Sequence, residues 1–147
     1  MKTIIRSPKG KGIFAAAILL CYMACLPACS PKIPFETSTV VPSADGAVKV
    51  KRDGNNNYSI DINIKHLANP NRLVPSKSLY VVWAETRENG TKNLGRLNTS
   101  SSLLSSTLKS SLKTVSPVKP TAIFITAEND ASTQFPGSQV VMTTRNF

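Results

Sequence analysis

The stretch YSIDINIKH, residues 58–66, decides the fold class of this 147-residue chain. Apolar and polar side chains alternate along it, and a period of two is the pattern of a β-strand with one buried and one solvated face. The buried face carries Tyr58, Ile60, Ile62 and Ile64. A strand wet on one side is typical of an antiparallel sheet.

The neighbouring segments extend the sheet. Residues 47–52, AVKVKR, also alternate, and DGNNN at 53–57 has the composition of a hairpin turn. Residues 79–86, LYVVWAET, are apolar on both faces in their first half, which predicts a central strand. Residues 87–93 predict a turn, and residues 94–97 begin the return strand.

Residues 98–116 fit either a helix or a strand. Leu104, Leu108 and Leu112 recur every four residues, as in a helical stripe, yet they also share one face of a strand. The serines and threonines around them favour neither state strongly. We favour a strand because the neighbouring segments are strands.

Residues 121–128 and 139–145 predict the last two strands. About seven strands in about 100 residues predict an all-β fold, an antiparallel β-sandwich spanning residues 47–147. Its single core is expected to hold Trp83, Phe124 and Tyr80 beside the isoleucines.

The N-terminus has the composition of a secretory signal peptide. A basic start precedes an apolar segment at residues 13–26, which is shorter than the roughly 20 residues of a membrane span. Leu26-Pro27-Ala28-Cys29 resembles a bacterial lipobox. The resemblance implies removal of residues 1–28 and acylation of Cys29, and two or three acyl chains anchor a protein stably. An ordinary secreted protein, or a single N-terminal helix, is the alternative.

The three cysteines fit this interpretation. Cys21, Cys25 and Cys29 crowd into one short stretch, whereas a disulfide framework spreads its cysteines through the domain. A structural zinc site needs four ligands, and the only histidine is His66. Cys21 and Cys25 would therefore leave with the signal peptide.

Residues 29–46 predict an extended tether between the lipid and the sandwich, because they hold three prolines and little periodicity. Ser30 follows Cys29 at the position where an aspartate would suggest retention at the inner membrane. The expected location is the cell envelope, lipid-anchored at the outer membrane.

The net charge of the chain is +10. Without residues 1–28 it loses four of its 18 basic residues and none of its eight acidic ones, which leaves 14 − 8 = +6. Only Lys49, Lys51 and Arg52 form a tight basic group, whereas nucleic-acid binding favours a basic stripe with interleaved aromatic residues. A soluble surface with some affinity for anionic lipid or glycan is favoured over a nucleic-acid partner.

No catalytic group, cofactor or metal site is expected. A Ser-His-Asp arrangement would have to use His66, which ends a strand just before a proline-containing loop. The nearest acidic pairs, Glu85 with Glu88 and Glu128 with Asp130, flank turns.

One short loop resembles a calcium site in its spacing. Asp53, Asn55 and Asn57 have the alternate oxygen spacing of a calcium loop, but Gly54 lies inside the triad and no glutamate occupies the bidentate position. A turn is the favoured interpretation.

The folded part resembles the C-terminal extracytoplasmic domain of anti-sigma-K factor-like proteins. That family has Tyr-x-x-Trp on a strand, a glycine-containing turn and Leu-Gly on the return strand, followed by a Thr-x-Glu element, a Pro-Gly loop and a terminal valine-rich strand. The match spans residues 58–145. It is carried by Tyr80, Trp83, Gly90, Leu94, Gly95, Thr126, Glu128, Pro136, Gly137, Val140 and Val141.

The resemblance implies an immunoglobulin-like sandwich. It does not imply anti-sigma activity, because a separate cytoplasmic domain binds the sigma factor in that family, and it supplies no catalytic residues. The expected function is a non-catalytic interaction or sensing module on a lipid anchor, with an envelope protein as the possible partner. The alternative is a glycan- or surface-ligand-binding lipoprotein, which requires Tyr80 and Trp83 to be exposed near a loop rim.

Overall fold

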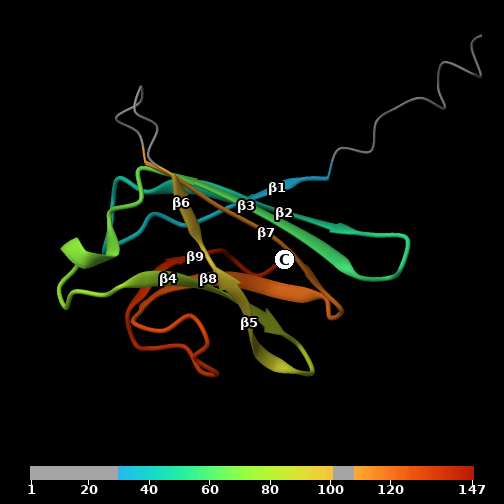
Figure 1. Cartoon of the computed structure of the whole chain (residues 1–147). Coiled ribbons are helices and arrows are strands. Elements are labelled where there is room, and N and C mark those ends of the chain that lie inside the picture. The colour runs from blue at the N-terminus through green and yellow to red at the C-terminus, as the bar shows by residue number, and fades with distance from the viewer. Residues whose placement is uncertain (1–29, 101–107) are drawn as a thin grey trace, which may run out of the picture.

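The computed structural model describes residues 30–100 and 108–147. Within them the chain forms two antiparallel sheets that face each other, one of five strands in the order β1-β2-β3-β7-β6 and one of four in the order β5-β4-β8-β9 (Figure 1). The elements are β1 (Lys32–Pro34), β2 (Asp45–Arg52), β3 (Tyr58–Lys65), the 3-10 turn η1 (Pro70–Arg72), β4 (Leu79–Thr86), β5 (Gly90–Arg96), β6 (Asn98–Ser100), β7 (Lys109–Ser116), β8 (Pro120–Glu128) and β9 (Val140–Thr143).

The strand order is that of an immunoglobulin-like sandwich. Strands β2-β3-β7-β6 correspond to the A-B-E-D sheet of that fold, and β9-β8-β4-β5 to its second sheet with one added edge strand. The predicted all-β sandwich is therefore confirmed. The described residues hold nine strands instead of about seven because β1 and β6, of three residues each, were not predicted as separate strands.

The central prediction for residues 58–66 is confirmed. Strand β3 pairs with β2 on one side and β7 on the other. Ile60, Ile62 and Ile64 are buried between the sheets, and the polar residues between them face outward. Burial of these isoleucines is a main source of the hydrophobic stabilisation of the sandwich.

Strand β4 is central, as predicted, but its two faces contribute to different clusters. Tyr80 and Val82 point into the core between the sheets. Trp83 and Phe124 are buried in a second cluster with Val81, on the outer face of the four-stranded sheet. The prediction that Trp83 and Phe124 belong to the single core is therefore wrong: both are buried, but on the other side of their sheet.

Residues 32–46 differ from the predicted tether because they are part of the sandwich. Strand β1 pairs with β2, and the backbone N–H of Phe35 donates to the carbonyl of Gly46 at 3.0 Å. The next residue reaches the other sheet, since the N–H of Glu36 donates to the carbonyl of Thr143 at 2.8 Å. Phe35 and Val41 are buried. The folded domain thus begins near residue 32 and not at residue 47, and this segment joins the two sheets along one edge.

The ambiguous residues 98–116 contain β6 and β7, so the described part of this segment is strand, as favoured. Leu112 packs against the core from β7. Leu104 lies outside the described residues. The preceding turn is shorter than predicted, because β5 begins at Gly90 instead of Leu94.

The predicted signal peptide, residues 1–28, and the predicted acylation site, Cys29, also lie outside the described residues. In the part of the chain that is described, no helix has the length and hydropathy to cross a bilayer.

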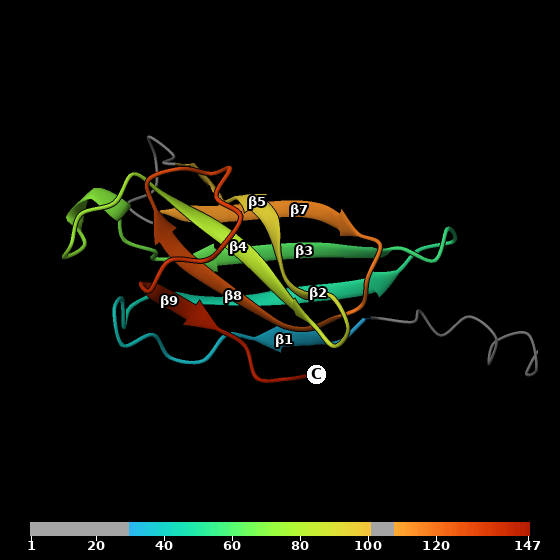
Figure 2. The same ribbon diagram turned by 90° about the horizontal axis from the view of Figure 1, so that it is seen from below.

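The two ends of the sandwich carry different loops. The β2–β3 hairpin and the start of β1 lie at one end, and the loop that contains η1 lies at the other (Figures 1 and 2). Figure 2 shows that residues 129–139, between β8 and β9, lie across the outer face of the four-stranded sheet. Because Trp83 on this face is fully buried, we infer that the loop covers the second apolar cluster.

Candidate functional site

The loop at residues 129–139, called the β8–β9 loop below, lies over the sheet face that carries two stacked aromatic side chains. Trp83 and Phe124 are directly opposite each other on β4 and β8, and their rings stack with centroids 6.3 Å apart. Trp83 is fully buried. Large aromatic side chains bury about 150–250 Å² each, so covering them stabilises the loop against the sheet.

A chain of buried hydrogen bonds fixes the end of this loop. The indole Nε1–H of Trp83 donates to Thr126 Oγ1 at 2.8 Å, and the Thr126 hydroxyl donates to Glu128 Oε1 at 2.6 Å. The same carboxylate oxygen accepts the backbone N–H of Gly137 at 2.7 Å. The chain of contacts therefore runs from β4 across β8 and into the loop.

Gly137 lies very close to the Glu128 carboxylate. A Cβ atom on this residue would lie 2.9 Å from both carboxylate oxygens of Glu128, closer than side chains normally approach. The absence of a side chain lets the backbone N–H reach the carboxylate. Glycine is thus part of the site through close approach and not through an unusual backbone angle.

The middle of the loop is held from a second direction. Asn93 on β5 donates through Nδ2 to the carbonyls of Ala131, at 3.0 Å, and Thr133, at 2.8 Å. Asp130 accepts from the N–H and the hydroxyl of Ser132, and these hydrogen bonds lower the pKa of the Asp130 carboxyl below its usual value. The loop therefore has a defined shape along its length.

The tip of this fixed loop presents an aromatic side chain to solvent. Phe135 is 79% exposed, although its neighbours are hydrogen-bonded in place. The loop at residues 67–78 lies beside its end, where Gln139 Nε2 donates to the carbonyl of Val74 at 3.5 Å. Val74 is 94% exposed. Two neighbouring loops thus expose apolar side chains that contribute little to the fold.

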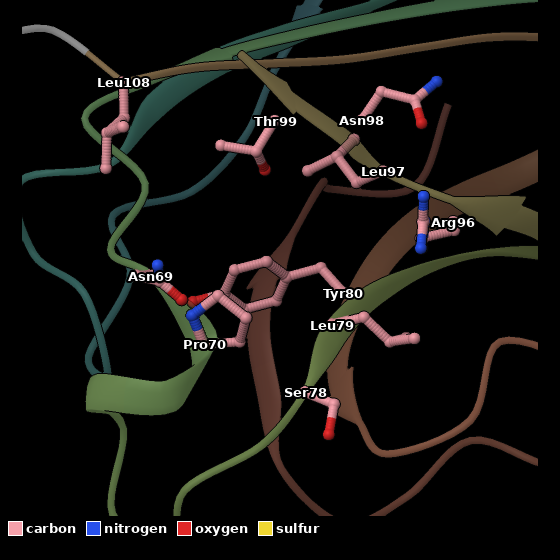
Figure 3. A pocket seen from close by; sticks show the side chains of 10 residues that line it. All are labelled: Asn69, Pro70, Ser78, Leu79, Tyr80, Arg96, Leu97, Asn98, Thr99 and Leu108. Carbon is pink, nitrogen blue, oxygen red and sulfur yellow. The ribbon is translucent and has the colours of Figure 1, made fainter. Parts of the chain in front are cut away.

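A pocket of about 310 Å³ lies beside Tyr80 (Figure 3). The Tyr80 ring extends from β4 toward Asn69 and Pro70, with Leu97 and Thr99 on the other side of the pocket. The Tyr80 hydroxyl donates to the carbonyl of Ala68 at 2.9 Å, and burial raises the pKa of Tyr80 to about 12. Small-molecule sites range from about 300 to 1,000 Å³, so this pocket is at the small end of that range.

The other residues weighed from the sequence are far apart. Asp53 Oδ1 accepts the backbone N–H groups of Asn55, at 2.8 Å, and Asn57, at 2.9 Å, which is the geometry of a turn. His66 is exposed, has a positive φ of 57° and donates its backbone N–H to Leu108. In the described residues, no three His, Cys, Asp or Glu side chains lie close enough to hold a metal ion.

The acidic pair at residues 128 and 130 separates in the structure. Glu128 is buried beneath the loop, whereas Asp130 is exposed within it. The aromatic pair required by the glycan-binding alternative is buried: Tyr80 is 2% exposed and Trp83 is 0% exposed. This alternative therefore loses the observation that favoured it.

No pattern in the sequence marks the exposed tip of the loop, but the residues that attach the loop do carry a signal. Trp83, Thr126, Glu128 and Gly137 are all positions that carry the resemblance described above, and the structure brings the four into one hydrogen-bonded chain. Phe135 precedes two of the matched positions but was not itself distinguished by any pattern. Comparison of the chain with protein-family models, curated proteins and solved structures gives no match.

Proposed function

We propose that this protein is a lipid-anchored, non-catalytic interaction module of the bacterial cell envelope, which binds a partner protein through the tip of the β8–β9 loop. The observation that carries the proposal is the exposed aromatic ring of Phe135 on a loop fixed by buried hydrogen bonds. Aromatic side chains, phenylalanine among them, are enriched in protein interfaces relative to the rest of the surface.

The fixed shape of the loop favours recognition. A flexible loop loses conformational freedom when it binds, and this loss reduces the affinity. Here Asn93 and Glu128 already hold the loop in place, so little ordering remains to oppose binding. Val74 on the adjoining loop is a second exposed apolar side chain that a partner could contact.

The anchor is supported by the lipobox-like residues 26–29, which follow a basic and then an apolar segment. Acyl labelling in a bacterial host tests it. Labelling should be sensitive to an inhibitor of the lipoprotein signal peptidase and absent from Cys29→Ala, whereas Cys25→Ala should be labelled as the wild type is. Inhibitor-sensitive labelling that survives Cys29→Ala would refute the anchor assignment.

The partner is tested by photo-crosslinking in the host cell. A benzophenone amino acid replaces Phe135, and in a matched control it replaces Phe147, an exposed phenylalanine near the C-terminus. We expect a discrete crosslinked protein from position 135 only, and its loss when Val74→Asp is added. The same bands from both positions, or no band from position 135, would argue against recognition by this loop.

A further inference from the structure

The outer face of the five-stranded sheet gathers positive charge. Each of its strands β1, β2, β3 and β7 contributes at least one outward lysine, all of them exposed: Lys32, Lys49, Lys51, Lys65, Lys109 and Lys113. We call this set the lysine face. Only Asp45 and Asp61 oppose it on these strands, so its formal charge is 6 − 2 = +4.

The register places like charges side by side. Lys32 is directly opposite Lys49, and Lys65 is directly opposite Lys109. Like charges in opposite cross-strand positions destabilise a sheet. The arrangement therefore does not serve the stability of the isolated sandwich, and an anionic surface placed over it would relieve the repulsion.

The ion pair between Asp61 and Lys113 on this face contributes little. Asp61 pairs with Lys113 at 3.9 Å, and the lysine side chain is 81% exposed. Exposed pairs of this kind contribute little to stability and are screened by salt. A hollow on the same face is lined by Lys32, Lys49 and Lys65 together with Asp45, so its lining carries an excess of positive charge.

The start of the domain places this face near the predicted anchor. Lys32 is the first residue of β1, the edge strand of the five-stranded sheet. Only three residue steps separate it from Cys29, and a chain of that length spans at most about 11 Å. A lipid on Cys29 would therefore hold the edge of the lysine face close to the headgroups of the bilayer.

We infer that the lysine face docks on a bilayer of anionic phospholipid. The inference rests on the lipid anchor of the proposed function and adds the orientation of the domain. Basic residues near an anionic membrane surface add to the binding given by acyl chains. In this orientation the β8–β9 loop points away from the membrane, because it lies on the outer side of the opposite sheet (Figures 1 and 2).

Site-specific fluorescence quenching tests this orientation with the full-length chain, produced in a bacterial host and purified in its acylated form. A single fluorophore is placed through Ser111→Cys, on the lysine face, or through Gln134→Cys, in the β8–β9 loop; both side chains are exposed. The labelled protein is reconstituted in vesicles that carry a nitroxide on a fraction of their headgroups. In vesicles containing phosphatidylglycerol we expect quenching at position 111 and not at position 134. Quenching at 111 should weaken with ionic strength and in purely zwitterionic vesicles.

Charge reversal supplies the matched controls. The double variant Lys49→Glu, Lys65→Glu brings the formal charge of the lysine face from +4 to zero, and the fraction of docked protein should fall roughly tenfold or more. Lys92→Glu with Lys119→Glu changes the net charge equally but affects exposed residues on β5 and in the β7–β8 turn. This second double variant should dock as the wild type does.

The outcomes separate the two proposals. An acylated, vesicle-bound chain that shows equal quenching at both positions, or none at position 111, overturns the docking and leaves the anchor intact. A label at 111 that responds to soluble polyphosphate but not to phosphatidylglycerol vesicles assigns the face to a soluble polyanion and also overturns the inference. Failure of the chain to be acylated contradicts the proposed anchor itself, and the docking with it.

Discussion

Replacement of Thr126 by valine should destabilise the sandwich and release the β8–β9 loop. Valine has nearly the shape of threonine, so the packing beside Trp83 is retained while the hydroxyl is lost. The indole N–H of Trp83 then has no acceptor at a fully buried site. Glu128 loses one of its two donors and keeps the N–H of Gly137.

The expected magnitude follows from these two losses. A buried donor left without a partner costs about 1–3 kcal/mol, and a hydrogen bond to a charged group contributes about 1.5–3 kcal/mol. The loop can relax and admit water to Glu128, so we take the lower part of the combined range, about 3 kcal/mol. A domain of this size typically has a free energy of unfolding of about 5–15 kcal/mol, so the loss is large enough to measure.

Urea unfolding of residues 30–147, followed by far-ultraviolet circular dichroism, measures this loss. The same method serves Trp83→Phe, which removes the only tryptophan and with it the fluorescence signal. The double variant completes a thermodynamic cycle, and we expect a coupling energy of about 1 kcal/mol or more between the two positions. Thr121→Val on the same strand, whose hydroxyl bonds at an exposed site, should change stability by less than about 0.5 kcal/mol. A Thr126→Val protein as stable as this control, or a coupling energy of zero, would refute the hydrogen-bonded attachment of the loop.

Three further changes probe other parts of the structure by the same unfolding measurement. Gly137→Ala should destabilise the domain by about 1–3 kcal/mol, because its Cβ would lie 2.9 Å from the Glu128 carboxylate. Gly54→Ala is the matched control, because Gly54 has open space around it. Equal effects of the two substitutions would contradict the close approach. Phe35→Ala should lose about 3–5 kcal/mol, whereas a residue in a free tether would give almost no change. Stability should also fall as the pH rises from about 10 to about 12, because the unfolded Tyr80 releases its proton near 10.0 while the folded one holds it to about 12. Tyr80→Phe should lack this part of the pH dependence, and an unchanged slope would show that another group causes it.

The sandwich could be predicted from its sequence because burial of one face of a strand makes every second residue apolar. In β3 every second residue is apolar, and each of these isoleucines is buried between the sheets. Strand β8 carries the apolar run Ala122–Ile125 in its middle, and it occupies a central position with nearly all of its residues buried. These patterns depend only on residues next to each other in the strand, so they can be seen without knowledge of the partner strands.

The outward direction of Trp83 could not be predicted in the same way. In LYVVWAET, Tyr80 and Val82 on one face are no less apolar than Val81 and Trp83 on the other. The direction of Trp83 depends on the segment that covers the outer face of its sheet. That segment is the polar β8–β9 loop, more than forty residues later in the sequence, which is linked to Trp83 through the hydrogen bonds of Thr126 and Glu128. No local pattern reports such a contact.

The segment before β2 was misjudged for a related reason. Its prolines suggested a free tether, but Pro34 ends an edge strand, where the missing N–H has little effect on the sheet. The buried apolar residues of this segment, Phe35, Val41 and Ala44, are too irregularly spaced to show a period. Long-range pairing with β9, through the N–H of Glu36, determines its place.

The two outer faces of the sandwich differ in a way that bears on both proposals. An antiparallel sandwich needs only its inner faces buried, and the outer face of the five-stranded sheet is polar as this rule expects. The four-stranded sheet instead buries Trp83 and Phe124 beneath a loop whose ordering opposes folding by about 1–2 kcal/mol per residue. Burial of the two rings offsets part of this cost. The buried hydrogen bonds of Glu128 offset a further part of it. None of these contributions requires an apolar residue at the tip of the loop. The exposed ring of Phe135 therefore contributes little to the stability of the fold. It lies on the side of the molecule opposite the lysine face. A domain held flat against a membrane would offer this ring to a partner.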